Sequence, residues 1–209
     1  AGATIDVGAI ADLTGGLTLV DAGGLATFGA LGQGTTGDIT VTDSSAGVTF
    51  GGAVTATTLT LTDTTAGEDI TFQGDLVATT LTSTATSAYD VQFDEDVTVT
   101  NDVDFGAIGT LTIGTADDDI ATFTGGVDAT SATGTVTLAG AINTVDTAMD
   151  FGNVTLADGT TFDTGNGAAG TIVVGDITTG TNEVSFDSGS TAGATIDVGA
   201  IADLTGGLT

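Results

Sequence analysis

The chain lacks several residue types altogether. Its 209 residues include no Lys, Arg, His, Cys, Pro or Trp, so the 28 acidic residues are uncompensated and the formal charge is −28. Without cationic side chains the chain cannot neutralise phosphates, which removes the main attraction to nucleic acids and to anionic membrane surfaces. Its apolar stretches are only a few residues long, far short of the roughly 20 residues that cross a bilayer. We therefore expect no nucleic-acid partner and no membrane insertion.

The missing side chains also restrict catalysis. His, Cys and Lys supply the usual general base near neutral pH, the thiolate nucleophile and the Schiff-base amine. Carboxylate chemistry remains, as in the paired-acid mechanism of glycoside hydrolases. Among 28 acids, however, some pair lies at a suitable separation by chance. We expect that the protein is not an enzyme and needs no cofactor, with a carboxylate-based polysaccharide-cleaving enzyme as an alternative.

A long exact repeat is present. Residues 1–18 and residues 192–209 both read AGATIDVGAIADLTGGLT, with an offset of 191. A recent tandem duplication would explain the identity, and so would a long array of near-identical units. We expect that residues 1–191 form one long-period unit and that residues 192–209 begin the next. The start at Ala1, without Met, favours a slice of a longer chain.

A shorter repeat is marked by phenylalanine. Phe28, Phe50, Phe72 and Phe93 follow one another at offsets of 22, 22 and 21, and threonine-rich runs such as TLTLT at 58–62 lie between them. Strict alternation of this kind is typical of strands with one buried face. Periods between about 20 and about 50 residues indicate units that bury their apolar faces by stacking. The predicted fold class is therefore all-β, a β-solenoid of about nine to ten coils of roughly 21 residues with uncapped ends.

A β-solenoid of this kind fixes which side chains point inward. In TLTLT, Leu59 and Leu61 should point inward and the threonines outward. Strands stacked about 4.8 Å apart give the 191-residue unit, about nine coils, a length near 43 Å. Open ends of a solenoid invite further strand pairing unless they are capped or continued. We therefore expect end-to-end self-association with like units.

The coils at Gly47–Ala66 (GVTFGGAVTATTLTLTDTTA) and Gly67–Ala88 (GEDITFQGDLVATTLTSTATSA) show this rhythm most clearly. In composition and coil rhythm the chain resembles the β-solenoid passenger regions of bacterial autotransporters, filamentous haemagglutinin-like proteins and giant bacterial surface adhesins. The resemblance implies an extracellular or cell-surface location and a structural role, with no catalytic residues to carry over. We expect a segment of an extracellular filament, sheath or surface stalk.

Two acidic clusters are candidate metal sites. Hard divalent cations such as Ca²⁺ take six to eight oxygen ligands, which adjacent acidic turns with backbone carbonyls could supply. Solvated acidic loops are the competing interpretation, because the EF-hand spacing is missing. A calcium-rigidified adhesin segment is thus an alternative function. The candidate ligands are Asp94, Glu95, Asp96, Asp117, Asp118 and Asp119, and Asn101, Asp102 and Asp104 follow the first three closely in the sequence.

The Thr-X-Thr runs allow one more alternative. Flat arrays of outward threonines on a β-solenoid resemble the ice-binding face of several antifreeze proteins. Threonine is also a common residue on exposed strands, and the positions of the Thr-X-Thr runs drift after Thr100.

Overall fold

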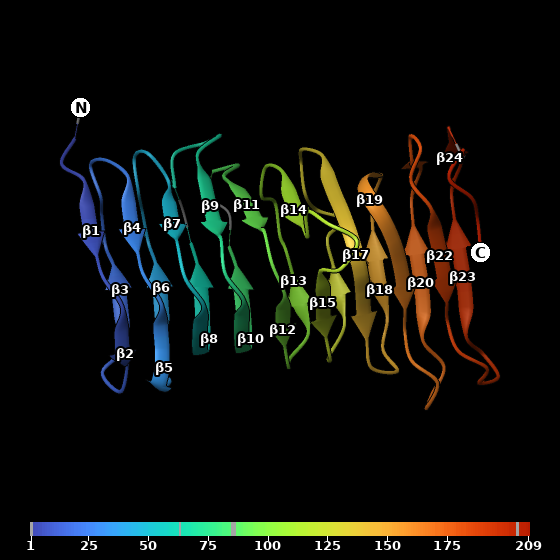
Figure 1. The fold of residues 1–209 in the computed structure, drawn as a ribbon, viewed down its shortest axis with the longest axis horizontal. Helices are drawn as coiled ribbons and strands as arrows, with labels where there is room; N and C mark the ends of the chain where they lie inside the picture. The colour runs from blue at the N-terminus through green and yellow to red at the C-terminus, as the bar shows by residue number, and fades with distance from the viewer. Residues whose placement is uncertain (1, 63, 85–86, 204) are drawn as a thin grey trace.

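The computed structural model describes residues 2–62, 64–84, 87–203 and 205–209. Within these ranges the chain forms strands and turns and no helix, and every strand pairing is parallel. The strands stack along the long axis of the molecule, with the two termini at opposite ends (Figure 1). None of the described residues belongs to a helix long and apolar enough to cross a membrane.

Each coil contributes strands to three ladders, here called ladders 1, 2 and 3. Ladder 1 contains β1 (Ile5–Val7), β4 (Ala26–Phe28), β7 (Val48–Phe50), β9 (Asp69–Phe72), β11 (Asp90–Phe93), β14 (Leu111–Ile113), the first parts of β17 (Val136–Thr144) and β19 (Val154–Asp163), β21 (Ile177–Thr178) and β24 (Ile201–Ala202).

Ladder 2 contains β2 (Ile10–Asp12), β5 (Leu31–Thr35), the first parts of β8 (Val54–Leu61) and β10 (Leu76–Ser83), β12 (Val97–Val99), β15 (Ile120–Phe123), the last parts of β17 and β19, and β22 (Val184–Asp187). Ladder 3 contains β3 (Leu17–Leu19), β6 (Ile39–Val41), the last parts of β8 and β10, then β13 (Val103–Asp104), β16 (Val127–Asp128), β18 (Met149–Phe151), β20 (Thr171–Val174) and β23 (Thr195–Val198). In ladder 3, β13 contacts β10 without strand pairing and begins a separate sheet.

The ladders fix the length of a coil. Ladder 1 runs from Ile5 to Ile201 through ten strands, so the paired residues of successive strands lie on average about 22 residues apart in the sequence. The predicted β-solenoid is confirmed, and its coils are slightly longer than predicted.

The core follows the alternation of the strands. Leu59 and Leu61 are fully buried, while Thr58 and Thr60 on the same strand are half-buried and face outward. The predicted orientation is therefore confirmed. Aliphatic residues stack coil over coil through the interior, together with eight buried phenylalanines and Tyr89. The phenylalanines are Phe28, Phe50, Phe72, Phe93, Phe105, Phe123, Phe151 and Phe162.

Glycine is required where neighbouring coils come close at a bend. Gly47 has φ +80°, a conformation that residues with a side chain rarely adopt. A Cβ at this position would also lie 2.5 Å from the carbonyl oxygen of Asp69 in the next coil. The turn that precedes β7 thus depends on both the flexibility and the small size of glycine.

Candidate functional site

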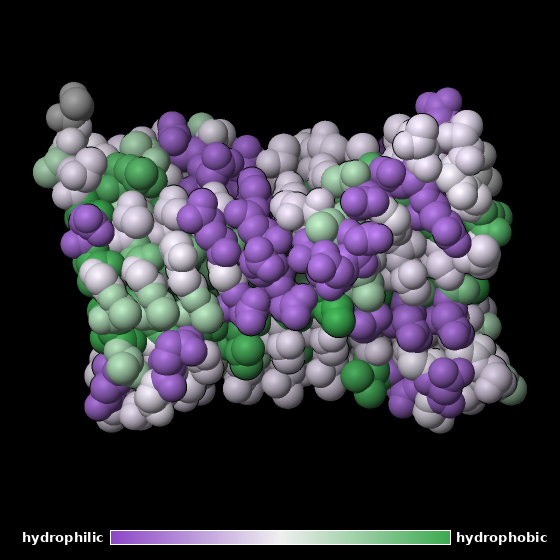
Figure 2. Space-filling model, viewed as in Figure 1, coloured by the Kyte–Doolittle hydropathy of each residue, from purple (hydrophilic) through white to green (hydrophobic). Residues whose placement is uncertain are grey.

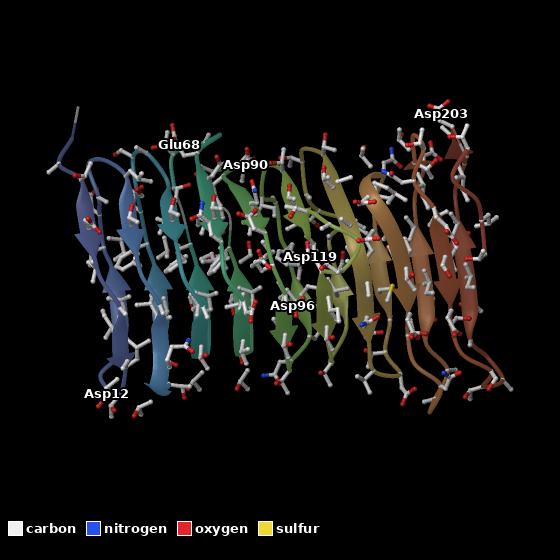
Figure 3. All side chains as sticks on the ribbon, in the orientation of Figure 1. Asp12, Glu68, Asp90, Asp96, Asp119 and Asp203 are labelled. Carbon is white, nitrogen blue, oxygen red and sulfur yellow. The ribbon has the colours of Figure 1, made fainter. Side chains whose placement is uncertain are left out.

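The two acidic clusters lie on adjacent coils. One forms the turn between β11 and β12, and the other forms the turn between β14 and β15. The Thr115 hydroxyl donates a hydrogen bond to the Asp94 carbonyl oxygen at 3.2 Å, and the Ile120 backbone N–H donates to Asp96 Oδ1 at 2.8 Å. Asp96 and Asp119 lie near the middle of the molecule in Figure 3. The structure therefore brings together the two turns that the sequence analysis singled out.

Part of this acidic set is already engaged by backbone donors. Asp119 is buried, and its Oδ2 accepts hydrogen bonds from the backbone N–H groups of Thr115 and Ala116 at 2.6 and 2.9 Å. Asp96 accepts a backbone hydrogen bond from the following coil. By contrast, Glu95, Asp117 and Asp118 are not buried, and none of them accepts a hydrogen bond of this kind from the backbone of the residues that the structure describes. Asp119 thus stabilises its own turn.

No three His, Cys, Asp or Glu side chains converge in a metal-binding group in the described parts of the chain. The six candidate ligands share two neighbouring turns, but their carboxylates do not gather around one point. Calcium binding at these turns stays a prediction.

A second acidic feature, a ladder of aspartates, was not predicted. Asp104 pairs in register with Asp128, and Asp128 with Asp150, on the outward side of ladder 3. Burial, and secondarily the charge of Asp128, raises the pKa of the Asp150 carboxyl. Asp128 Oδ1 accepts hydrogen bonds from the Thr130 N–H at 2.8 Å and hydroxyl at 2.7 Å. Residues far apart in the sequence are thus direct neighbours, and the recurrence of Val-Asp at 103–104 and 127–128 was the available signal.

A carboxylate enzyme would need a cleft around a pair of acids with opposite roles. One shallow surface depression of about 230 Å³ is lined by Asp117 and Glu183 together with Gly159, Thr160, Thr161 and Ser185. The raised pKa, however, belongs to Asp150, which does not line this depression. The carboxylate with a raised pKa and this pair of acids therefore lie at different places.

Outward threonines form two arrangements. In ladder 1 a single column extends over most of the solenoid, and its register places Thr27, Thr49, Thr71, Gln92, Thr112, Thr137, Thr155 and Thr178 above one another. In ladder 3 the column Thr18, Thr40, Thr60 and Thr82 covers the first four coils. Ladder 3 carries Asp104 and Asp128 further along. The expected drift of the Thr-X-Thr positions after Thr100 therefore applies to ladder 3, while the threonine column of ladder 1 continues.

The two end coils differ from all others in their environment. β1, β2 and β3 pair only with the coil that follows, and β23 and β24 pair only with the coil that precedes, within the described residues. Ile196 is 47% exposed, although its ladder partner Ile172 is fully buried. Leu208 is 54% exposed, although its partner Val184 is fully buried. At the N-terminal end, Ile5 and Val7 are half-buried. Each end thus presents unpaired backbone groups beside partly exposed apolar side chains.

The side surface has a different character. Figure 2 shows hydrophilic residues gathered over the middle of the viewed face. Among the described residues, Asp119 is the one acidic side chain that is buried, so the other acidic side chains lie on the surface all along the stack, including Asp6 and Asp197 in the two end coils.

Three parallel ladders around one continuous core define the chain as a β-solenoid. Comparison with protein-family models, with curated proteins and with solved structures finds no match.

Proposed function

We propose that the protein is a structural segment of an extracellular filament, sheath or cell-surface stalk, in which like units join end to end. The observation that carries this proposal is the duplicated segment, which pairs with the following coil in residues 1–18 and with the preceding coil in residues 192–209. An unpaired strand edge beside exposed apolar residues favours addition of another strand. The neighbouring unit can belong to the same chain or to another chain, since the same edge would be used in both cases.

The charge distribution supports axial joining. The chain carries a formal charge of −28 and has no Lys, Arg or His to offset it. Two stacks lying side by side would bring their acidic sides together, and this repulsion is strongest at low ionic strength. The ends offer apolar side chains and free backbone groups. Association at the ends is therefore favoured over lateral association.

The surface location rests on the resemblance in composition and coil rhythm to bacterial surface β-solenoids. A chain without Lys and Arg also offers no cleavage site to trypsin-like proteases. Resistance of this kind suits a protein that remains outside the cell.

The proposal can be tested with two variants that add the same charge. Ile196→Asp places a carboxylate on the C-terminal edge, and Val77→Asp places one on the side of the stack. The two parent side chains are similarly exposed, at 47% and 45%. We expect the wild type and Val77→Asp to form elongated particles at moderate salt, and Ile196→Asp to give markedly shorter ones, as measured by negative-stain images and analytical ultracentrifugation. Circular dichroism of both variants checks that the fold is retained.

Compact monomers of the wild type at every protein concentration and salt concentration would contradict end-to-end joining. Equal shortening by both variants would show that added charge, and not the end coil, controls assembly.

A further inference from the structure

The duplicated 18-residue segment occupies both ends of the solenoid, and the two copies use opposite edges. In the first copy Ile5 and Val7 pair with Ala26 and Phe28 of the following coil. In the second copy Ile196 and Val198, the equivalents of Ile5 and Val7, pair with Ile172 and Val174 of the preceding coil. Taken together, the two copies show one sequence paired on both of its edges, with apolar partners on each side.

The glycines of the segment show the same division. A Cβ added at Gly8 meets nothing within 4 Å, whereas one added at Gly199, its equivalent, would lie 2.9 Å from the carbonyl carbon of Gly175 in the preceding coil. Gly15 is likewise open, whereas a Cβ at its equivalent Gly206 would overlap the carbonyl carbon of Asn182.

The opposite holds for the first glycine. A Cβ at Gly2 would clash with the following coil at the Gly23 carbonyl oxygen. A Cβ at its equivalent, Gly193, would meet only the Ala169 Cβ at 3.6 Å. The first copy therefore needs a small residue where it faces the following coil, and the second copy needs small residues where it faces the preceding coil. The segment has the sequence of a coil with a neighbour on each side.

Resting on the end-to-end assembly proposed above, we infer that successive units share one copy of this segment as a single coil. The coil of β20, β21 and β22 from one unit lies on one side of it, and the coil of β4, β5 and β6 from the next unit lies on the other. Where the units are separate chains, residues 192–209 of one chain take the place of residues 1–18 in a second copy of the chain.

The charges distinguish sharing from simple stacking of the two end coils. Stacking the identical segments in register would set Asp197 against Asp6, and Asp203 against Asp12. Like charges directly opposite each other on neighbouring strands are destabilising. In the shared coil Asp197 lies against Thr27, because Asp6 pairs with Thr27. On the other side it lies against Val173. Sharing therefore avoids both pairs of carboxylates.

The shared coil also fixes how one unit is turned against the next. Ile5 belongs to ladder 1, but its equivalent Ile196 belongs to ladder 3. Nine coils separate Ile5 from Ile201, and Ile196 lies one ladder position before Ile201. The 191-residue period thus covers eight and two-thirds coils. The equivalent residues Asp12 and Asp203 lie at opposite ends and on opposite margins of the view in Figure 3.

Each unit is consequently displaced by one ladder relative to the last, which is about a third of a turn. At about 4.8 Å per coil, the rise per unit is about 42 Å. A surface feature of one unit, such as the aspartate ladder, then appears on each of the three ladders in turn along three units.

Disulfide trapping tests the shared coil directly, because the chain contains no cysteine of its own. Chains carrying Asp197→Cys and chains carrying Thr27→Cys are mixed, unfolded, refolded together and oxidised. Neighbouring strands about 4.8 Å apart lie within the Cα separation of roughly 4.4 to 6.8 Å that a disulfide spans. We expect covalent dimers from this pair, and several-fold fewer from a mixture of Asp197→Cys and Asp6→Cys. The double variant Asp6→Cys/Thr27→Cys, which should close within one chain, confirms that the register permits the bond.

Covalent dimers from Asp197→Cys and Asp6→Cys would overturn the shared coil but still support end-to-end assembly. Long particles in which neither cross-link forms would have the same meaning. If the chains stay monomeric, the proposed function fails for separate chains. The shared coil is then tested by itself in a tandem chain, in which residues 1–209 are followed directly by residues 19–209 of a second unit. In that chain a cysteine at 197 should bond with one at Thr27 of the second unit. Absence of this bond would overturn the shared coil. The shared coil predicts that long particles repeat about every 42 Å along the axis, with a rotation of about a third of a turn per unit. Images that show a different axial repeat or a different rotation would also overturn the shared coil.

Discussion

Phe50 and Phe72 stack with their ring centroids 4.7 Å apart and their planes 12° apart. This separation matches the spacing of strands in a sheet, so each ring lies directly over the ring of the next coil. Phe28 and Phe93 extend the stack, with centroid separations of 5.5 and 5.1 Å to their neighbours. The regular interval of phenylalanines in the sequence is therefore the spacing of one coil.

Removing one ring from this stack should destabilise the whole solenoid. Phe50 is fully buried between two rings, and truncation of such a residue costs about 3 to 5 kcal/mol. We expect Phe50→Ala to lower the free energy of unfolding by this amount in urea titrations followed by circular dichroism. Thr49→Ala, on the outward side of the same strand, should change it by less than about 0.5 kcal/mol. Similar effects of the two variants would contradict the inward stack.

The sequence predicted the fold because one ring per coil and alternating threonines define a period directly. It could not predict the aromatic positions after Phe93. Phe93 lies in ladder 1, but Phe105 follows β13 in ladder 3 and Phe123 lies in ladder 2. The rings meet edge to face there, with centroids 6.2 and 6.1 Å apart and planes at 62° and 88°. The interval becomes irregular because the aromatic position moves from ladder to ladder and because the coil length also varies there. Paired positions of ladder 1 are 25 residues apart from Leu111 to Val136 but 18 residues apart from Val136 to Val154.

The candidate site was predicted only in part. The two acidic turns were identified from local runs of acids, and their adjacency follows from the coil length. The use of Asp119 by backbone N–H groups depends on the conformation of one turn, and the pairing of Asp128 with Asp150 depends on exact register. The ladder shift of the duplicated segment needs the number of strands per coil, which sequence periodicity alone does not give.

The duplicated segment allows a matched test with one substitution at two places. Gly199→Ala places a methyl group against the backbone of Gly175, whereas Gly8→Ala places it in open space. We expect Gly199→Ala to destabilise the C-terminal coil by about 1 to 3 kcal/mol, as overpacking does, and Gly8→Ala to leave the monomer unchanged. Hydrogen exchange of residues 192–209 and 1–18 would measure both effects. Equal loss of protection at the two ends would contradict this.

Asp119 should be important for the turn between β14 and β15. Its Oδ2 accepts two backbone N–H groups, so Asp119→Ala would leave both without a partner, at a cost of about 1 to 2 kcal/mol. Asp118→Ala removes an equal charge from a neighbour that is not buried and should be nearly neutral. Urea midpoints of the two variants give the comparison, and a neutral Asp119→Ala would show that these hydrogen bonds do not stabilise the fold.

Comparing Ca²⁺ with Mg²⁺ should distinguish a specific calcium site from general screening of the negative charge. With a formal charge of −28, any added salt reduces the repulsion among carboxylates, so we expect Ca²⁺ and Mg²⁺ at equal ionic strength to raise the melting temperature alike. A site at the two acidic turns would instead favour Ca²⁺, and the combined variant Asp94→Asn/Glu95→Gln/Asp117→Asn would abolish that preference. The triple variant Asp6→Asn/Asp21→Asn/Asp43→Asn removes three charges elsewhere and provides the control for lost charge.

Asp150 should give the chain a distinctive dependence on pH. Burial and the neighbouring Asp128 raise the pKa of its carboxyl above the ordinary value of 3.8. The folded chain therefore binds this proton more tightly than the unfolded chain, and the contribution of Asp150 to stability rises as pH falls through the raised pKa toward 3.8. At neutral pH the ionised carboxylate is destabilising, so Asp150→Asn should raise the urea midpoint at pH 7. The difference between variant and wild type should shrink as the pH falls into that window. Asp117→Asn, which removes a charge that is not buried, serves as the control, and an equal gain in both variants at every pH would show that total charge, and not the environment of Asp150, controls stability.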